Sequence, residues 1–412
     1  MFKNTRNKIL LALSAVGPGL FLIGYNIGTG SVTTMAKAGA EYGMMLFWLV
    51  ILSCIFTYIL MVAYGQVTLV SGKTALFNIK THLKAGKLLA LYIMTALIIG
   101  ELLALVGIMG IVADLVQEGI RLLNMGWVVN TEWIILLLVI CLFFMFWFGR
   151  YKVFEKILTL FVILMALCFI AVFFMVSPNL PSIIAGAVPH MPDNAGAFGI
   201  AAAMAGTTCS AAVFIIRSTV VAEKGWTINN LKDEKRDAFV SSLMMLLLSG
   251  LIMAVSAGTL HLMGLKLDNT LDLIHLFEPI GGKVAAFLLI LGIVGAGLST
   301  IFPIVLIAPW LISDYRGTPR DIRSPLYRVF IVGGLLVAFC SIFMEKSPIY
   351  LMVFSMAFQA AILPAVAIPI FLLLNKASLM NENKASLTMN IGLITVIVFS
   401  FVTTYFAIKG FF

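Results

Sequence analysis

Two short stretches of glycine and small polar residues interrupt long apolar segments of this chain. The first is Gly28-Thr29-Gly30-Ser31, preceded by Asn26, and the second is Gly206-Thr207-Thr208-Cys209-Ser210. A helix that breaks inside a bilayer leaves backbone N–H and C=O groups unpaired, which is costly unless protein or a watery cavity satisfies them. Freed amides, carbonyls and hydroxyls that face a cavity can hold an ion or a small solute. The chemistry expected of these residues is therefore binding, although close helix packing through small residues would explain each stretch separately.

Three other polar residues lie inside apolar segments. Glu101 is the only acidic residue well inside one, and such a costly group suggests a function. It could carry a coupling proton, compensate a bound cation, or serve as a structural carboxylate. Arg217, about two to three turns after the second stretch, could attract anions, pair with an acidic group or snorkel to the surface. Gln359 could present its amide to a cavity or form an interhelical hydrogen bond.

Motifs for covalent catalysis and nucleotide hydrolysis are absent from the sequence. There is no Walker-type glycine-rich loop, no Ser-His-Asp arrangement and no His-Glu-X-X-His. The five cysteines lie in apolar segments without a Cys-X-X-Cys pair, which indicates buried thiols rather than disulfides or zinc ligands. We therefore expect neither an enzyme nor a bound cofactor.

The elements that must position these residues are membrane-spanning helices. Of 412 residues, 62% are apolar and 11% are charged, and the mean hydropathy is +1.10, which excludes ordinary soluble classes. Apolar runs of about 20 residues, enough to cross the hydrocarbon core, recur along the whole chain. Eleven spans are predicted, at roughly 8–36, 43–70, 88–122, 131–149, 154–177, 195–222, 237–263, 282–312, 326–344, 348–374 and 388–409.

The basic residues that give the net charge of +9 are unevenly distributed among the loops of this topology. Of the 27 Lys and Arg residues, 20 fall at the amino terminus and the even-numbered loops, six fall on the opposite side, and Arg217 lies within a span. Positive-inside bias then places the amino terminus in the cytoplasm and the carboxyl terminus outside. We expect a multi-pass protein of the plasma membrane whose surroundings are lipid, with no nucleic-acid partner. The oligomeric state is not predicted.

The spans divide into two halves that each open with a glycine-interrupted segment. Residues 8–177 form the first five-helix repeat, 195–374 the second, and 388–409 an additional eleventh helix, all within one membrane domain covering 1–412. An odd number of spans per half forces the halves into opposite orientations. The predicted fold is an all-α inverted 5+5 repeat of the leucine-transporter type, with helices 1 and 6 broken.

The order of the segments resembles the Nramp family of proton-coupled divalent metal transporters. The resemblance covers most of the chain. It rests on short motifs that occur in the family's order: Gly17-Pro18-Gly19, Val70-Ser71-Gly72-Lys73, Arg150-Tyr151-Lys152-Val153-Phe154-Glu155-Lys156, Gly186-Ala187-Val188-Pro189, Asp237, Gly297-Leu298-Ser299-Thr300, and Ser355 with Leu363-Pro364 and Pro369.

The chain departs from that family at the residues that the resemblance implies are functional. The family's metal-binding Asp-Pro-Gly-Asn falls on Gly28-Thr29-Gly30-Ser31, and its Met-Pro-His falls on Ser210-Ala211-Ala212. Further family positions are also replaced. A second His falls on Arg217, third-span acidic residues fall on Ile108 and Ile111, and a tenth-span Gln falls on Ile362, whereas Glu101 matches a family Glu.

The resemblance implies a carrier of a divalent cation with changed selectivity and with proton coupling reduced or absent. Thr29, Ser31, Thr207 and Ser210 are the expected metal-binding side chains, and Glu101 would supply most of the negative charge. Without an ionic or sulfur ligand from the broken helices, a hard and largely hydrated ion such as Mg²⁺ is favoured over Mn²⁺ or Fe²⁺. The alternative is a carrier of amino acids or other small organic solutes on the same fold, since helix N-termini can bind a carboxylate.

Overall fold

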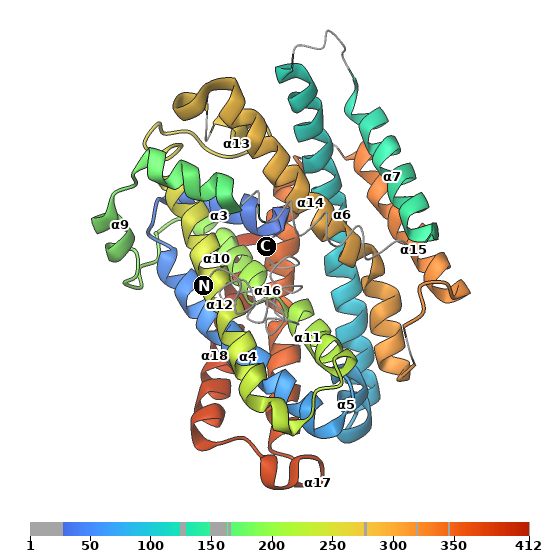
Figure 1. Cartoon of the computed structure of the whole chain (residues 1–412). Coiled ribbons are helices and arrows are strands. Elements are labelled where there is room, and N and C mark those ends of the chain that lie inside the picture. Colours follow the sequence, from blue (N-terminus) through green and yellow to red (C-terminus); the bar gives the residue numbers. More distant parts are fainter. Residues whose placement is uncertain are drawn as a thin grey trace, which may run out of the picture.

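The computed structural model describes residues 28–123, 129–148, 163, 166–275, 278–318, 320–344 and 347–411. Within these ranges every regular element is a helix (Figure 1). The α-helices of ten or more residues that carry a label are α3 (Thr29–Tyr42), α4 (Phe47–Ser71), α6 (Gly86–Leu122), α7 (Thr131–Phe148), α10 (Ala195–Thr208), α11 (Ala211–Glu223), α12 (Leu231–Gly258), α14 (Glu278–Arg316), α15 (Pro325–Phe339), α16 (Pro348–Leu374) and α18 (Leu387–Phe411). The shorter ones are α5 (Ala75–His82), α9 (Leu180–Ala185), α13 (Asp272–His275), α17 (Ala377–Met380), η1 (Ile228–Asn230), η2 (Cys340–Phe343) and η3 (Asn381–Asn383).

Nine helices of the described part are long and apolar enough to cross a membrane. They account for nine of the predicted spans, because length and apolar composition fix where a spanning helix lies. The two other spans are described only in part. The structure describes 28–36 of the predicted span 8–36, where α3 begins, and 163 and 166–177 of the span 154–177, with the short helix Ala166–Val176. The number eleven and the division into repeats stay predictions.

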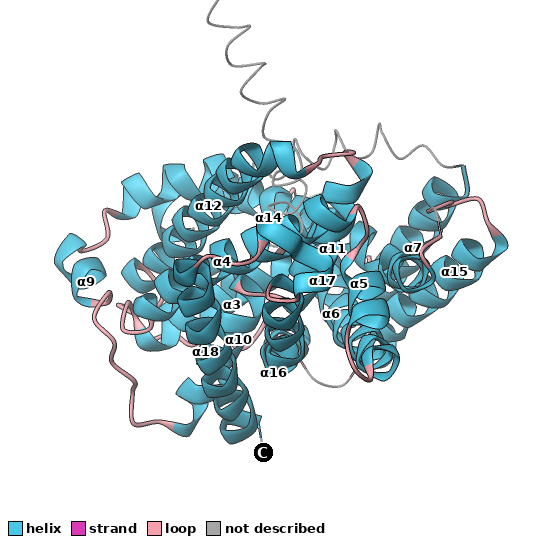
Figure 2. Cartoon of the chain, turned by 90° about the horizontal axis from the view of Figure 1, so that it is seen from below, coloured by secondary structure: helices cyan, strands magenta, loops and turns pink. Residues whose placement is uncertain are grey.

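The broken sixth segment lies at the centre of the molecule. In the most apolar stretch of α10 and α11 all residues are buried, compared with 22% in α7 and 28% in α15 with η2. Helix α10 packs against α16, α18 and α3, and α6 packs against α14 and α16. Figure 2 shows α7 and α15 at one edge of the bundle, away from α10. The exposed apolar surfaces of α7 and α15 suit contact with lipid, whereas α3, α10 and α16 enclose the interior.

Helix α3 is fixed at its far end by charged contacts. The Nζ of Lys37 lies 2.6 Å from Oε1 of Glu41 and 2.9 Å from Oδ1 of Asp268. It also donates a hydrogen bond to the carbonyl of Leu267 at 2.8 Å. Ser347, just before α16, donates to the carbonyl of Asp268 at 2.6 Å. The loop before α13 thus links the carboxyl-terminal half of α3 to the start of α16. These contacts anchor α3 at the end opposite to its first turn.

Candidate functional site

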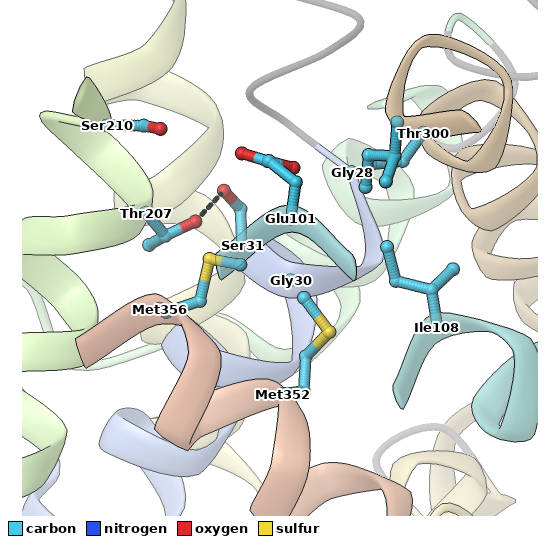
Figure 3. A pocket seen from close by; sticks show the side chains of 11 residues that line it. Gly28, Gly30, Ser31, Glu101, Ile108, Thr207, Ser210, Thr300, Met352 and Met356 are labelled. Carbon is cyan, nitrogen blue, oxygen red and sulfur yellow. Dashed lines mark hydrogen bonds between the residues drawn. The ribbon is translucent and has the colours of Figure 1, made fainter. Parts of the chain in front are cut away.

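A small pocket lies where five helices meet at the start of α3. Its volume is about 30 Å³, enough for a bare ion or about one or two water molecules. The side chains are shown in Figure 3, where Ser31 and Thr207 face each other. The lining residues, which we call the central pocket, are Gly28, Gly30, Ser31, Glu101, Ile108, Thr207, Ser210, Thr300, Ile304, Met352 and Met356.

The two glycine-containing stretches come together at this pocket. The hydroxyl oxygens of Ser31 and Thr207, 176 positions apart in the sequence, form a hydrogen bond of 2.7 Å. Helix α3 begins at Thr29 after an extended Gly28, and α11 begins at Ala211 after an extended Ser210. Neither helix start has a side-chain cap, so both present first-turn N–H groups and the positive end of a helix dipole.

The interruption of the sixth segment lies at the end of the predicted stretch Gly206-Thr207-Thr208-Cys209-Ser210, and not at its glycine. Gly206, Thr207 and Thr208 are helical, and the chain leaves the helix at Cys209 and Ser210. The reason lies in the packing of Gly206, because a Cβ at that position would lie 1.8 Å from the carbonyl oxygen of Met356. Gly206 therefore allows α10 to approach α16 closely, as expected where small residues serve helix packing.

Glu101 projects from α6 and is held by α16. It is buried, and the amide nitrogen of Gln359 donates a hydrogen bond of 2.7 Å to its Oε1. One turn earlier on α16, Ser355 donates to the carbonyl of Gly100 at 3.3 Å. These contacts orient the carboxylate, and among the described residues Glu101 is the only carboxylate that lines the central pocket. Gln359 therefore orients Glu101 and does not itself line the pocket.

Not every residue predicted from the two stretches reaches the central pocket. Gly28, Gly30, Ser31, Thr207 and Ser210 line it, whereas Thr29, Gly206, Thr208 and Cys209 do not. The Thr29 hydroxyl points toward Gly297 of α14. A Cβ added to Gly297 would lie 2.9 Å from the Thr29 hydroxyl oxygen. Thr208 donates to the carbonyl of Met204 at 2.9 Å, and Cys209 is a buried free thiol. Asn26 lies outside the described residues.

Arg217 is part of a separate buried ionic cluster. Its guanidinium contacts Glu234 through NH2 at 2.8 Å and through Nε at 3.0 Å, and contacts Asp237 through NH1 at 2.5 Å. All three side chains are fully buried, which rules out snorkelling to the surface. Burial lowers the pKa of the nearby Lys224, with Asp237 opposing the shift and Arg217 adding to it. Arg217 joins α11 to α12 and is not a lining residue of the central pocket.

Sulfur lines the pocket, which was not predicted from the sequence. Met352 and Met356 line the central pocket from α16, whereas the absence of sulfur was expected only for the two broken helices. Thr300, Ile108 and Ile304 also line it. A signal was present in the sequence, because Met352, Ser355, Met356 and Gln359 are spaced i, i+3, i+4 and i+7 and share one helix face. Methionine in an apolar helix usually fills space in the core, so this pattern on one face of α16 did not by itself predict a binding site.

The donor set of the central pocket is unusual for a metal site. Among the described residues no group of three or more His, Cys, Asp and Glu side chains is arranged to hold a metal. A cation in the pocket would instead meet the Glu101 carboxylate, the hydroxyls of Ser31, Thr207, Ser210 and Thr300, and the two thioethers. Oxygen ligands suit hard ions and thioethers suit soft ones.

The packing role of Gly206 can be tested by the Gly206→Ala substitution. We expect it to lower the midpoint of thermal unfolding in detergent, since overpacking costs about 1–3 kcal/mol. Gly333→Ala is the matched control, because a Cβ at Gly333 in α15 has no atom within 4 Å among the contacts of the described residues, and alanine favours helix by up to about 1 kcal/mol. Equal midpoints for the two variants would contradict the close approach of α10 and α16.

Three comparisons with known proteins bear on this geometry. The family model described as natural resistance-associated macrophage protein-like, Nramp, matches residues 19–409. A divalent metal cation transporter MntH of Staphylococcus saprophyticus is 24% identical, over 99% of this chain and 95% of its own length. A second MntH, of Erwinia tasmaniensis, is 22% identical over 72% of this chain and 71% of its own length.

Solved structures share the fold. A manganese transporter of Eremococcus coleocola superimposes with a TM-score of 0.71 at 15% identity, covering 95% of this chain and 85% of its own. Mhp1, a nucleobase-cation-symport-1 family transporter in a closed conformation with bromovinylhydantoin bound, gives a TM-score of 0.62 at 13% identity, covering 96% and 92%. The same helical arrangement therefore occurs in proteins that handle different solutes.

Proposed function

Because this chain belongs to the Nramp family, whose model matches nearly its whole length, we propose that it is a secondary transporter that moves a divalent metal cation across the membrane by alternating access. It is a multi-pass membrane protein, and its curated relatives are transporters of divalent metal cations. The interruption of this chain's sixth segment at Cys209 and Ser210 suits a binding site that faces each side of the bilayer in turn.

The observation that carries this proposal is the size and charge of the central pocket. At about 30 Å³ it accommodates an ion with little of its hydration shell, whereas pockets for organic ligands usually measure about 300–1,000 Å³. Glu101 supplies a buried negative charge at the same place. A dehydrated cation needs such a charge to offset the loss of water.

Selectivity and coupling are proposed to differ from those of the manganese transporter. In the described part of the chain one carboxylate lines the pocket, and Ile108 stands there where the family resemblance implies an acidic residue. A proton route therefore has few titratable groups, so coupling is reduced or absent. Hydroxyls and retained water favour a hard ion such as Mg²⁺. The Met352 and Met356 thioethers instead favour softer ions such as Mn²⁺ over Mg²⁺. Uptake of Mg²⁺ and of Mn²⁺ must therefore be compared.

A carrier of small organic solutes is the second candidate, and one observation favours it. The helix starts at Gly28 and Ser210 both line the pocket and lack side-chain caps, which is a favourable setting for a carboxylate. The pocket volume opposes this candidate, since an amino acid needs several times the space of an ion. We favour the cation for that reason.

The cellular orientation belongs to the same proposal. The excess of Lys and Arg at the amino terminus and the even-numbered loops supports a plasma-membrane protein with its amino terminus in the cytoplasm and its carboxyl terminus outside.

Uptake into proteoliposomes tests the function. We expect saturable uptake of Mn²⁺ or Mg²⁺ and none of amino acids, with Thr207→Ala raising the apparent KM several-fold because a hydroxyl lining the pocket is lost. Thr395→Ala is the control, since Thr395 is exposed on α18 and donates to the carbonyl of Gly392. Saturable amino-acid uptake without any divalent transport would instead establish the second candidate.

A further inference from the structure

Helix α14 meets the first turn of α3 through two contacts in which a glycine faces a threonine. A Cβ added to Gly297 of α14 would lie 2.9 Å from the hydroxyl oxygen of Thr29 in α3. In the other direction, a Cβ added to Gly28 would lie 2.9 Å from both Cβ and Cγ2 of Thr300, and would overlap its hydroxyl oxygen. Carbon atoms pack at about 3.5–4.0 Å. The Thr300 side chain therefore occupies the space of the side chain that Gly28 lacks.

The Thr300 side chain is held in place beside Gly28. Its hydroxyl donates a hydrogen bond of 2.8 Å to the carbonyl of Ala296, one turn earlier in α14, which favours one rotamer of a stiff, β-branched residue. Rotation would also leave the Thr300 Cβ where it is. Because the hydroxyl proton bonds to Ala296, the oxygen offers lone pairs to any ligand in the central pocket, which Thr300 and Gly28 both line (Figure 3). This wall of the pocket thus presents a neutral acceptor.

The charge of the central pocket gives this wall its importance. Glu101 contributes one negative charge, whereas a divalent cation carries two positive charges and the starts of α3 and α11 add positive partial charge. A second anionic ligand would offset this remaining charge and the loss of hydration. A side chain at Gly28 has no room to supply it, since Thr300 already fills the same space.

We propose that Thr300 is a specificity-determining residue of the central pocket. It fills the space beside Gly28 and excludes an anionic ligand from this wall, so that a divalent cation meets a neutral oxygen there. This inference rests on the proposed function and deepens it. A neutral oxygen compensates less for removed water than an anion does, so this wall favours ions that keep part of their hydration shell, as Mg²⁺ commonly does. An anion at position 300 would strengthen the binding of Mn²⁺ more than that of Mg²⁺.

Substitutions at Thr300 test the effect of charge at this wall. Binding of Mn²⁺ and of Mg²⁺ to the purified full-length protein is measured by calorimetry. Thr300→Asp is expected to tighten Mn²⁺ binding by about tenfold or more relative to Thr300→Asn, as is common for close charge pairs, and to tighten Mg²⁺ binding less. Thr300→Asn is the matched control, because the two side chains have the same shape and differ in charge. Thr300→Val keeps the shape of threonine without the hydroxyl and is expected to weaken the binding of both ions several-fold.

A double-mutant cycle tests whether Gly28 and Thr300 share one space. Gly28→Ala alone is expected to lower the midpoint of thermal unfolding, because the added methyl group overlaps Thr300. In the combination of Gly28→Ala with Thr300→Gly the side chain is moved from α14 to α3. The loss caused by Gly28→Ala is therefore expected to disappear largely when it is measured against Thr300→Gly, since residues in contact are not additive.

Ser299→Ala controls for changes in α14 outside the central pocket. Ser299 donates to the same carbonyl of Ala296 at 2.7 Å and does not line the pocket, so its replacement is expected to leave binding within about twofold. If Thr300→Asp does not fold, the weakening by Thr300→Val relative to Ser299→Ala decides whether the hydroxyl at this wall is a ligand.

The outcomes distinguish this inference from the proposed function. Equal Mn²⁺ affinities of Thr300→Asp and Thr300→Asn, equal affinities of Thr300→Val and Ser299→Ala, or additive effects in the cycle would overturn the role of Thr300. Uptake of Mn²⁺ and Mg²⁺ by the native chain is measured in parallel in proteoliposomes. Absence of that uptake, with the difference between Thr300→Asp and Thr300→Asn intact, would reject the transport function and support the role of Thr300 in binding.

Discussion

Glu101→Gln is expected to reduce cation uptake roughly a hundredfold. The substitution keeps the shape of the side chain and leaves the Gln359 amide an oxygen to bond, but it removes the carboxylate that Glu101 contributes to the central pocket. Losing one member of a buried charge pair costs about 2–5 kcal/mol, and each 1.4 kcal/mol is about tenfold in affinity. Initial rates of uptake over a range of metal concentrations measure the effect.

Glu118→Gln provides the control for this substitution. Glu118 lies on the same helix, is 9% exposed, and pairs with Arg121 at 3.3 Å, outside the central pocket. Its replacement is expected to leave uptake within about twofold, because Glu118 does not line the central pocket and its partner Arg121 is 78% exposed, so that their pairing contributes little. Running both variants with and without a pH gradient also tests coupling. If Glu101→Gln retains the rate and the pH dependence of the native chain, the carboxylate has a structural role only.

Arg217→Met is expected to cause the largest loss of stability. It leaves Glu234 and Asp237 buried without their common guanidinium, and breaking a buried ion pair from one side costs about 3–5 kcal/mol. We expect a large fall in the midpoint of thermal unfolding, followed by light scattering or by size-exclusion chromatography after heating, together with a low yield of monodisperse protein.

Two further variants show whether charge causes that loss. Combining Arg217→Met with Glu234→Gln and Asp237→Asn removes all three charges, and part of the stability should return, because a neutral buried set avoids uncompensated charge. Arg121→Met at an exposed position, where the side chain is 78% exposed, should change the midpoint little. If the triple variant is no more stable than Arg217→Met, packing rather than charge accounts for the role of Arg217.

The spanning helices could be predicted because their determinants are local. The predicted span 348–374 coincides with α16, and 88–122 nearly coincides with α6, since apolar length alone specifies them. Within the predicted stretch, the break lies at Cys209 and Ser210 and not at Gly206, because a glycine can either end a helix or allow a close neighbour. Only the carbonyl of Met356, far away in the sequence, decides between these roles for Gly206.

The side chains around the central pocket could be predicted only in part. Glu101 was recognised because an acidic residue in an apolar segment is rare, and Ser31 and Thr207 because both halves repeat the same chemistry. Met352 and Met356 were missed, since methionine is common in membrane helices and its sulfur is significant only when the rotation of α16 is known. Arg217 could not be assigned because its partners lie on the next helix, and pairing across helices is set by packing.

Met356 contacts two other helices at once, α10 through its backbone and α3 through its side chain. Its carbonyl oxygen lies against Gly206 of α10, while its thioether lies against Gly30 of α3. Because α10 and α16 are in close contact at this carbonyl, a shift of α16 relative to α10 would also move the Met356 sulfur relative to Ser31 and Thr207.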